Sequence, residues 1–451
     1  MVGLGGRRIA VLLALGGCAA PAADRGPTTL PGDGGNGPVL RVDGEAVMLG
    51  QAATSLQLRT FVMRVQARGA ASQGEEAGEL VRTHPDLAER ALFSREVSPE
   101  TQETIALWLD DAAAPLRGGW SLLVADRASD PDRYAAWEAQ REAAWSAFRR
   151  GGFAEVVRMD FALPEGGATP WPSADATSLR AAAMLASGRP ADAAGLFARA
   201  SELTEEWDAR YAMRSRLFEV LGHRLAGAFG AAALAREAAV QGATLGEIDD
   251  PMVLRLLLET EEEGAAATTG FSRRQVRARL GRVEMQRGAP QAALLAWRKA
   301  ETEPGSSPSR DRVRLGQAEA LVALGQEQPA IAMLAGLAGG DLRSEALAML
   351  GLVQLRRGQG DLALAVLREA VETTTPEANP GVYADAGLAL LSTGDTERGL
   401  SLLHRARDEF SARGDMAALR RLLMNELRYA EAVQDSGLSS DVRQRLIGTH
   451  P

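Results

Sequence analysis

The chain contains one cysteine and four histidines among 451 residues. A single thiol excludes an intrachain disulfide, and without a Cys-x-x-Cys motif nothing indicates a zinc ribbon, a thioredoxin-like centre or haem attachment. The histidines are not paired at metal-ligand spacing, and the sequence has neither a phosphate-binding Gly-x-x-x-x-Gly-Lys-Ser/Thr loop nor a Gly-x-Ser-x-Gly elbow. The sequence therefore predicts a protein that is not an enzyme and that holds no metal or cofactor.

Negative charges outnumber positive charges, and aromatic side chains are scarce. The chain has 50 Lys and Arg residues against 59 Asp and Glu residues, and this balance excludes general nucleic-acid binding, which needs a basic surface. Aromatic residues make up 5% of the chain, which argues against a sugar-binding surface. Hydrophobic residues make up 46%, mostly alanine and leucine, and with abundant arginine and glutamate this composition favours helices.

The first 18 residues have the pattern of an export signal. Two arginines precede an apolar run at 9–15, and this run is followed by Gly16, Gly17 and Cys18. The run is too short for a transmembrane helix, which needs roughly 20 residues. A charged start, a short apolar run and small residues are typical of a secretory signal peptide. A buried core cysteine is disfavoured by the glycines, and a twin-arginine signal fits the flanking residues less well.

This segment resembles the lipobox of bacterial lipoproteins, in which a cysteine directly follows the small residues. The resemblance implies cleavage before Cys18, a lipid on its thiol, and a protein held to a membrane by its N-terminus. Ala19 as the next residue implies sorting to the outer membrane, facing the periplasm. Residues 19–39 are rich in glycine, proline and alanine without an apolar period, which predicts a flexible tether with a reach of about 25 Å.

One spacing recurs along the rest of the chain. Gly358 is followed by Ala363, Leu367 and Ala370, and four other segments place small or large apolar residues at the same intervals. The glycines at 288, 325, 358 and 394 lie 37, 33 and 36 residues apart. A glycine ends one helix in a left-handed conformation, and small residues in the next helix allow close packing. Each helical hairpin then leaves an apolar face that only the next hairpin can cover.

This pattern resembles the tetratricopeptide repeat, whose period is 34 residues. It predicts an all-α fold: an α-solenoid of tetratricopeptide-like hairpins with an N-terminal helical region. The alternative is a generic helical bundle. The predicted division is a signal peptide, a tether, an N-terminal helical region, the repeats and a C-terminal helical cap, at residues 1–17, 18–40, 41–130, 131–410 and 411–451.

Local signals place several element boundaries. Ser98-Pro99, Asp130-Pro131 and Asp250-Pro251 each predict a helix start, because a capping side chain precedes a proline at the first helical position. Residues 416–432 predict a further helix and 264–270 a loop. Acidic pairs such as Asp249-Asp250 are interpreted as solvated caps and loop ends.

The resemblance to tetratricopeptide arrays implies a peptide-binding groove lined by the first helix of each pair. Transferred by spacing, the positions predicted to contact a protein or peptide partner are Arg279, Arg282, Arg312 and Arg356, with Glu319, Leu352 and Leu388 beside them. Such a partly basic, partly apolar stripe would accept an acidic segment or a terminal carboxylate. The alternative is that these arginines are ordinary solvated helix residues. The family's carboxylate clamp has asparagine at its ninth position, which is absent here.

The leading functional hypothesis is a non-enzymatic envelope lipoprotein whose repeats bind a protein partner as a scaffold or assembly factor. Two alternatives are a small-molecule or glycan-binding lipoprotein and an enzyme domain in 41–130 docked through the repeats. The only candidates for chemistry there are His84 and Asp86. His84-Pro85-Asp86 resembles the tripeptide of chaperone J-domains, but the basic helix that should precede it is absent, and we interpret it as a helix start.

Overall fold

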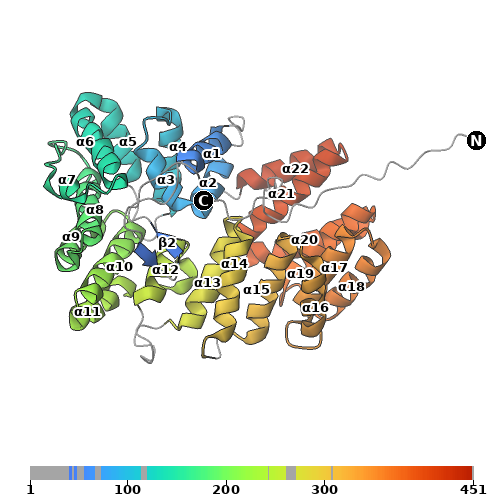
Figure 1. Ribbon diagram of the computed structural model, residues 1–451. Coiled ribbons are helices and arrows are strands. Elements are labelled where there is room, and N and C mark those ends of the chain that lie inside the picture. The colour runs from blue at the N-terminus through green and yellow to red at the C-terminus, as the bar shows by residue number, and fades with distance from the viewer. Residues whose placement is uncertain are drawn as a thin grey trace, which may run out of the picture. The chain divides into compact units, whose positions relative to one another are not determined.

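The protein divides into two compact units of helices, which we describe separately (Figure 1). The computed structural model describes residues 40–42, 45–47, 55–66, 73–112, 119–241, 243–260, 271–305 and 308–448. The N-terminal unit holds the described residues up to Arg287 together with 303–305, and the C-terminal unit holds 288–302 and the described residues from 308 onward. The predicted signal peptide, Cys18, residues 19–39 and the predicted loop at 264–270 lie outside the described residues.

The N-terminal unit is helical apart from one short antiparallel strand pair, β1 (Leu40–Val42) with β2 (Glu45–Val47), which composition did not indicate. Its helices up to the middle of the unit are α1 (Ser55–Gln66), α2 (Gln73–Thr83), α3 (Pro85–Leu92), α4 (Pro99–Ala112), α5 (Trp120–Ser129), α6 (Pro131–Arg149) and α7 (Phe153–Arg158). The remaining elements are α8 (Trp171–Ala186), α9 (Pro190–Thr204), α10 (Ala209–Leu225), α11 (Phe229–Val240), the 3₁₀ turn η1 (Leu245–Glu247), α12 (Pro251–Thr260) and α13 (Arg273–Gln286).

The C-terminal unit consists of helices throughout its described residues. They are α14 (Pro290–Thr302), α15 (Arg310–Ala323), α16 (Glu327–Leu337), α17 (Arg343–Arg356), α18 (Gly360–Glu372), α19 (Pro380–Thr393), α20 (Thr396–Ala412), α21 (Met416–Ala432) and α22 (Ser436–Gly448). Helices that are neighbours in sequence pack on one another, and α17 also packs on α19.

No described helix is long and apolar enough to cross a membrane.

Left-handed glycines end the first helix of each hairpin, as the repeat predicts. The φ angles of Gly288, Gly325, Gly358 and Gly394 are 70°, 71°, 75° and 92°. A residue with a β-carbon is strained in this conformation, whereas glycine adopts it freely. The chain can therefore reverse direction within two or three residues at the end of each first helix.

Close packing inside each hairpin explains the second part of the repeat. A β-carbon placed on Gly351 would lie 2.5 Å from Cγ of Leu367, and one placed on Gly387 would lie 2.7 Å from Cδ2 of Leu403. Leu367 is 2% exposed and Leu403 is fully buried. The second helix thus packs a leucine directly against the backbone of the first. These hairpins, stacked in sequence order, are the α-solenoid architecture that the period predicts.

The N-terminal unit is built around large aromatic side chains instead. Trp120 stacks on Trp171 with ring centroids 3.8 Å apart, and Phe93 meets the edges of Trp120 and Trp137 at 5.9 and 5.8 Å. Trp120, Trp137 and Trp171 are at most 1% exposed. The predicted helical region at 41–130 therefore packs on the repeat helix α8 through tryptophans.

The local sequence signals are confirmed. Helices α4, α6 and α12 begin at Pro99, Pro131 and Pro251, and α21 spans Met416–Ala432. The Asp130 side chain accepts the backbone N–H of Arg133 at 3.2 Å, which is the predicted cap.

Candidate functional site

Two of the four predicted partner-binding arginines lie in the N-terminal unit. Arg279 donates from Nε to the Ile248 carbonyl at 3.1 Å, and its guanidinium pairs with the Asp249 carboxylate. Its side chain is only 14% exposed. Arg282 is exposed and has no hydrogen bond or ion pair with any described residue. Of these two, Arg282 alone offers an uncommitted charge.

The other two lie in the C-terminal unit. Arg312 pairs with Glu345 at 3.1 Å between Nη2 and Oε1, and its side chain is 45% exposed. Arg356 is exposed and donates to the Val322 carbonyl over a long 3.4 Å contact. An exposed ion pair contributes little stability and opens readily, so both charges stay accessible at the surface.

The apolar part of the predicted stripe is wrong. Leu352 and Leu388 are 6% and 8% exposed, and Leu352 belongs to a core cluster with Val382 and Ala386 of α19. Successive first helices lie close enough to enclose these leucines, so they hold hairpins together instead of lining a groove. Glu319, at the equivalent position of α15, is exposed.

A single carboxylate on α19 stands out once these leucines are assigned to the core. Asp385 is half-buried and has no hydrogen bond or ion pair with any described residue. Burial, together with repulsion from Glu319, raises its pKa from 3.8 to about 7. The face carried by α15, α17 and α19 thus contains a carboxyl group that has no hydrogen bond or ion pair with the described part of the chain.

Spacing from the family did not find Asp385, but the sequence holds a signal for it. Asp385 is the only charged residue in the 14 residues of α19. A lone charge in an apolar helix requires a partner, a protonated state or solvent contact. The sequence prediction named arginines because these occupy the positions that line the groove in tetratricopeptide arrays, and Asp385 is not one of those positions.

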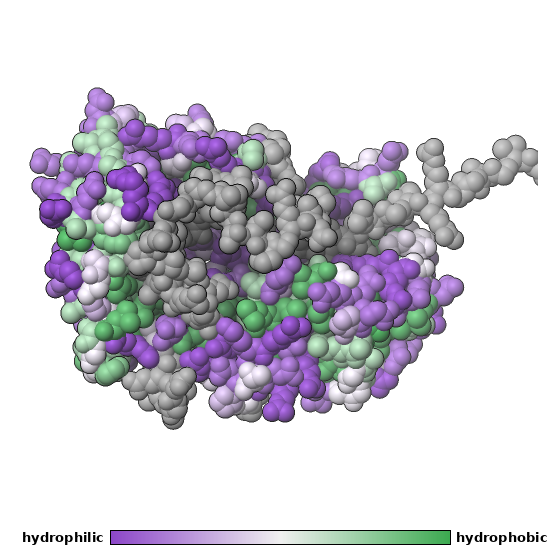
Figure 2. All heavy atoms as spheres, in the orientation of Figure 1, coloured by the Kyte–Doolittle hydropathy of each residue, from purple (hydrophilic) through white to green (hydrophobic). Residues whose placement is uncertain are grey.

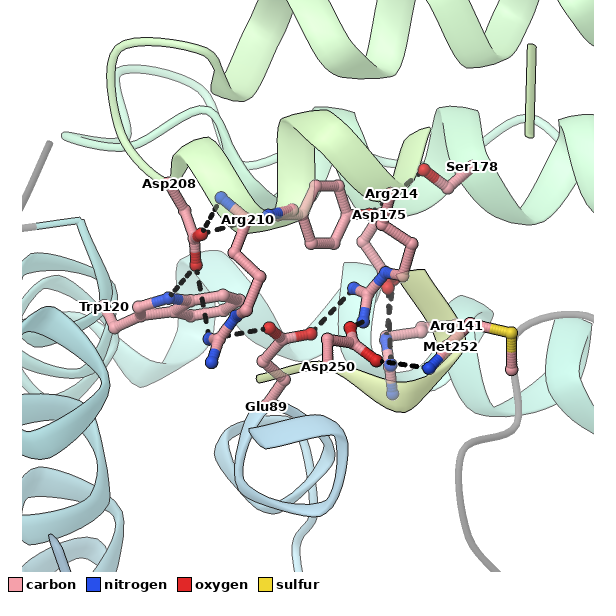
Figure 3. Close-up of polar contacts among 11 residues, drawn as sticks. Glu89, Trp120, Arg141, Asp175, Ser178, Asp208, Arg210, Arg214, Asp250 and Met252 are labelled. Atoms are coloured by element: carbon pink, nitrogen blue, oxygen red, sulfur yellow. Dashed lines mark hydrogen bonds and ion pairs between the residues drawn. The ribbon is translucent and has the colours of Figure 1, made fainter. Parts of the chain in front are cut away.

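The N-terminal unit contains a second charged cluster, which is buried (Figure 3). Glu89 of α3 accepts from Arg210 at 3.0 Å and from Arg214 at 2.7 Å, both on α10. Glu89 is 6% exposed, and burial raises its pKa although both arginines oppose the shift. Asp208 caps α10 and accepts the indole N–H of Trp120 at 2.9 Å.

Two further acids extend this buried cluster. Asp250 is 1% exposed, accepts the N–H of Met252 at 2.8 Å and lies 3.7 Å from Arg214. Its interpretation as a solvated cap is therefore wrong, because α10 covers the start of α12. Asp86 is 8% exposed and accepts from Arg287 at 3.2 Å. Opposite charges in contact and nearly closed to solvent fasten helices together, and we assign this cluster a structural role.

The tripeptide at 84–86 forms the start of α3, as interpreted. Pro85 is the first residue of the helix, and Asp86 is bound to Arg287 inside the unit. His84 is half-buried, and burial together with the nearby charge of Arg287 lowers its pKa to about 4. A buried aspartate and a neutral histidine leave this segment without an accessible pair for chemistry. The described residues also contain no group of three or more His, Cys, Asp or Glu side chains arranged to hold a metal ion.

Hairpins closed by left-handed glycines and stacked in sequence order define a tetratricopeptide-like helical-repeat protein. No family model and no curated protein matches the chain. Among solved structures the chain is similar to the apo form of RapI, with a TM-score of 0.31 and 11% identity over 88% of this chain and 96% of that chain. It is also similar to a chain of the APC/C hetero-tetramer Cut9-Hcn1, with a TM-score of 0.21 and 11% identity over 87% and 95%.

Proposed function

We propose that this protein is a non-enzymatic envelope lipoprotein, held to the outer membrane by a lipid on Cys18 and facing the periplasm, whose repeat helices bind a protein partner. The signal-like residues 1–18 support the anchoring. The stacked hairpins support the binding role, because such arrays expose long rows of side chains on their first helices. The partner is recruited to the membrane surface and held there as part of an assembly.

The observation that carries the binding role is Asp385. A half-buried carboxylate without an intrachain partner costs stability, and a cation brought by a partner would remove that cost. Glu319 adds negative charge nearby. We therefore propose that the C-terminal unit binds a segment of a partner that carries a lysine or arginine side chain. Arg282 and Arg356, which stay exposed, remain predicted contacts for acidic groups of the same or another partner.

Capture from native membranes tests this proposal. The acylated protein is purified from its own membranes with bound proteins, and the wild type is compared with Asp385→Asn. The matched control is Asp361→Asn, which removes an exposed carboxylate from the first turn of α18. We expect a specific partner with the wild type and the control, and a loss of about tenfold or more with Asp385→Asn. Recovery of the same proteins with all three variants would contradict the role of Asp385.

The anchor is tested separately. Cys18→Ser removes the thiol that would carry the lipid, so we expect the protein to move from the membrane fraction to the soluble fraction. A variant that stays in the membrane fraction after a high-salt wash would contradict lipid anchoring and leave partner binding as a separate question.

A further inference from the structure

The turn between α10 and α11 is apolar and exposed. Residues 225–231 are seven consecutive exposed residues with the sequence Leu-Ala-Gly-Ala-Phe-Gly-Ala. Leu225 is 55% exposed and Phe229 is 58% exposed, and Leu234 on the next turns of α11 is 70% exposed. Figure 2 shows that hydrophobic side chains also gather at other places on the visible face, among hydrophilic ones. Contiguous exposed apolar residues of this kind mark an interaction surface.

The other turns that close repeat hairpins differ in chemistry. Each described hairpin turn outside 225–231 contains at least one charged or amide side chain within the two residues that flank its left-handed residue. Those side chains include Arg189, Arg287, Gln326, Arg357, Asp395, Arg413 and Asp435. The apolar composition of 225–231 is therefore not a property of the repeat, and it needs its own explanation.

The backbone of this turn is already hydrogen-bonded. The N–H groups of Ala226, Gly227 and Ala228 donate to carbonyl oxygens of α10 at 3.0, 3.0 and 2.8 Å. Transfer out of water costs free energy for a backbone N–H group that has no hydrogen-bond partner, but not for one that is already bonded within the protein. In this segment the N–H groups that remain free are those in the first turn of α11, and a helix N-terminus binds oxygen acceptors such as those of lipid headgroups.

The size of the surface favours a bilayer over a second protein copy. Leu225, Phe229 and Leu234 together expose a few hundred Å², taking about 150–250 Å² for a whole large side chain. A stable protein interface needs about 800 Å² on each side and several hydrogen bonds. The side chains of 225–231 offer no hydrogen-bonding group. A shallow insertion of two or three apolar side chains into a membrane interface requires neither so large an area nor side-chain hydrogen bonds.

We propose that the α10–α11 turn inserts Leu225 and Phe229 into the interfacial region of a lipid bilayer. The proposal rests on the membrane anchoring of the proposed function. The predicted tether of about 20 residues would raise the local concentration of the folded chain near the membrane and so strengthen an insertion that the turn makes by itself. The inserted turn would give the N-terminal unit a fixed orientation on the membrane while the tether alone would leave it free to rotate.

A position-specific dye tests the insertion. The chain has one cysteine, so Cys18→Ser combined with Leu225→Cys gives a single thiol for a polarity-sensitive fluorophore. The matched control carries Leu362→Cys, which replaces a similarly exposed leucine, 48% against 55% for Leu225, near the charged turn at the start of α18. Neutral phosphatidylcholine vesicles are added in about 0.5 M salt, where surface electrostatics are screened. We expect a blue shift and increased emission for the dye at 225 and none for the dye at 362.

Loss-of-binding variants give the second readout. In the Cys18→Ser chain we expect Leu225→Ser with Phe229→Ser to reduce vesicle flotation by on the order of tenfold for each large side chain removed. The pair Leu295→Ser with Leu362→Ser, which removes two exposed leucines elsewhere, should leave flotation unchanged. Helical circular dichroism checks that all variants are folded. The dye also excludes binding through the apolar run at 9–15 alone, because it reports only its own position.

Three results would overturn the insertion. They are a dye at 225 that does not respond, equal shifts at 225 and 362, or binding that requires anionic vesicles and disappears in salt. A silent dye at 225 in a protein that still captures its partner and is released by Cys18→Ser would remove this proposal and leave the proposed function intact. A dye at 225 that responds, in a protein that captures no partner, would support the insertion and contradict the proposed partner binding.

Discussion

The two units are held together in different ways. In the N-terminal unit the largest fully buried side chains are three tryptophans and Tyr134, and a charged cluster around Glu89 lies among its helices. In the C-terminal unit the core consists mainly of small clusters of leucine, alanine and valine, such as that of Leu367 and Ala370 with Val382, with fewer aromatic side chains such as Trp297 and Tyr383. Contacts between small aliphatic side chains can recur between successive hairpins, whereas large aromatic and ionic contacts each require a specific partner at one position.

The units also differ in how far apart in sequence their contacts lie. Arg210 and Glu89 are 121 residues apart, and Arg287 and Asp86 are 201 apart. In the C-terminal unit Arg312 bonds Glu345, 33 residues away, which is one repeat. A repeat array with neighbour contacts only unfolds piece by piece, while long-range contacts couple a whole unit. The comparison therefore predicts one cooperative transition for the N-terminal unit and local transitions for the C-terminal unit.

Removing Glu89 should have the largest effect. Glu89→Ala leaves Arg210 and Arg214 without their shared carboxylate inside the unit, and breaking a buried pair in this way costs about 3–5 kcal/mol. We expect the unfolding midpoint of the N-terminal unit to fall by the corresponding amount. Urea unfolding followed by tryptophan fluorescence measures it, because every tryptophan except Trp297 belongs to that unit.

The control for Glu89 is an exposed ion pair in the same unit. Glu96 bonds Arg59 at 3.0 Å, with side chains 54% and 63% exposed. Glu96→Gln should change the free energy of unfolding by less than about 1 kcal/mol. Equal effects of the two substitutions would mean that the Glu89 cluster does not fasten its unit.

A cavity in the C-terminal unit should have a smaller and more local effect. Leu367→Ala removes a 2% exposed side chain that packs on the backbone at Gly351, and such truncations cost about 2–4 kcal/mol. Hydrogen exchange should accelerate in α17, α18 and α19 and remain unchanged in the N-terminal unit. Leu362→Ala removes a side chain on the same helix that is 48% exposed, so it should change hydrogen exchange in neither unit. Acceleration throughout the chain would show that the two units unfold together.

The same comparison explains what the sequence could reveal. The period made the C-terminal unit predictable, because its glycine turns and Leu367-type contacts are local and recur. Caps such as Asp130 were predictable for the same reason, since a cap and its target lie three residues apart. The pairing of Glu89 with Arg210 has no local signal, because nothing in either segment records which helix will face it.

Burial was the second point at which sequence reasoning failed. Leu352 and Leu388 occupy groove positions in the family, but here they fill the space between first helices. Asp250 lies in an acidic pair typical of a loop, yet α10 covers it. In each case the neighbour that decides burial comes from another helix, so spacing along one helix is insufficient.

The pH dependence of the N-terminal unit should reveal His84. Its pKa is lowered from 6.5 to about 4 in the folded chain, by burial and by the charges of Arg287 and Arg64. Between these two values the unfolded chain binds the proton and the folded chain does not, so stability falls as the pH is lowered from 6.5 toward 4. From pH 8 to pH 5 we expect the wild type to lose about 2 kcal/mol more than His84→Gln.

The difference between wild type and variant isolates His84. Burial raises the pKa of Asp86 and of Glu89, and raised carboxyl values act in the opposite direction, adding stability as the pH falls. Both acids are present in both proteins. Parallel stability curves for wild type and His84→Gln between pH 8 and 5 would mean that the histidine titrates normally in the folded unit.

For Asp385 the sign of the effect on stability is the informative part. The pKa of Asp385 is raised from 3.8 to about 7, so the folded chain holds a proton between these values, and stability falls as the pH rises toward 7. Above pH 7 the charged carboxylate remains as a cost. Asp385→Asn should therefore stabilise the C-terminal unit by up to about 4 kcal/mol at pH 8 and leave it unchanged below pH 4, as measured by urea unfolding at both pH values. Asp361→Asn, on the exposed start of α18, should be neutral at both. Destabilisation by Asp385→Asn at pH 8 would show that the chain itself uses the charge. Stabilisation together with lost partner capture would identify a residue retained for binding at the expense of stability.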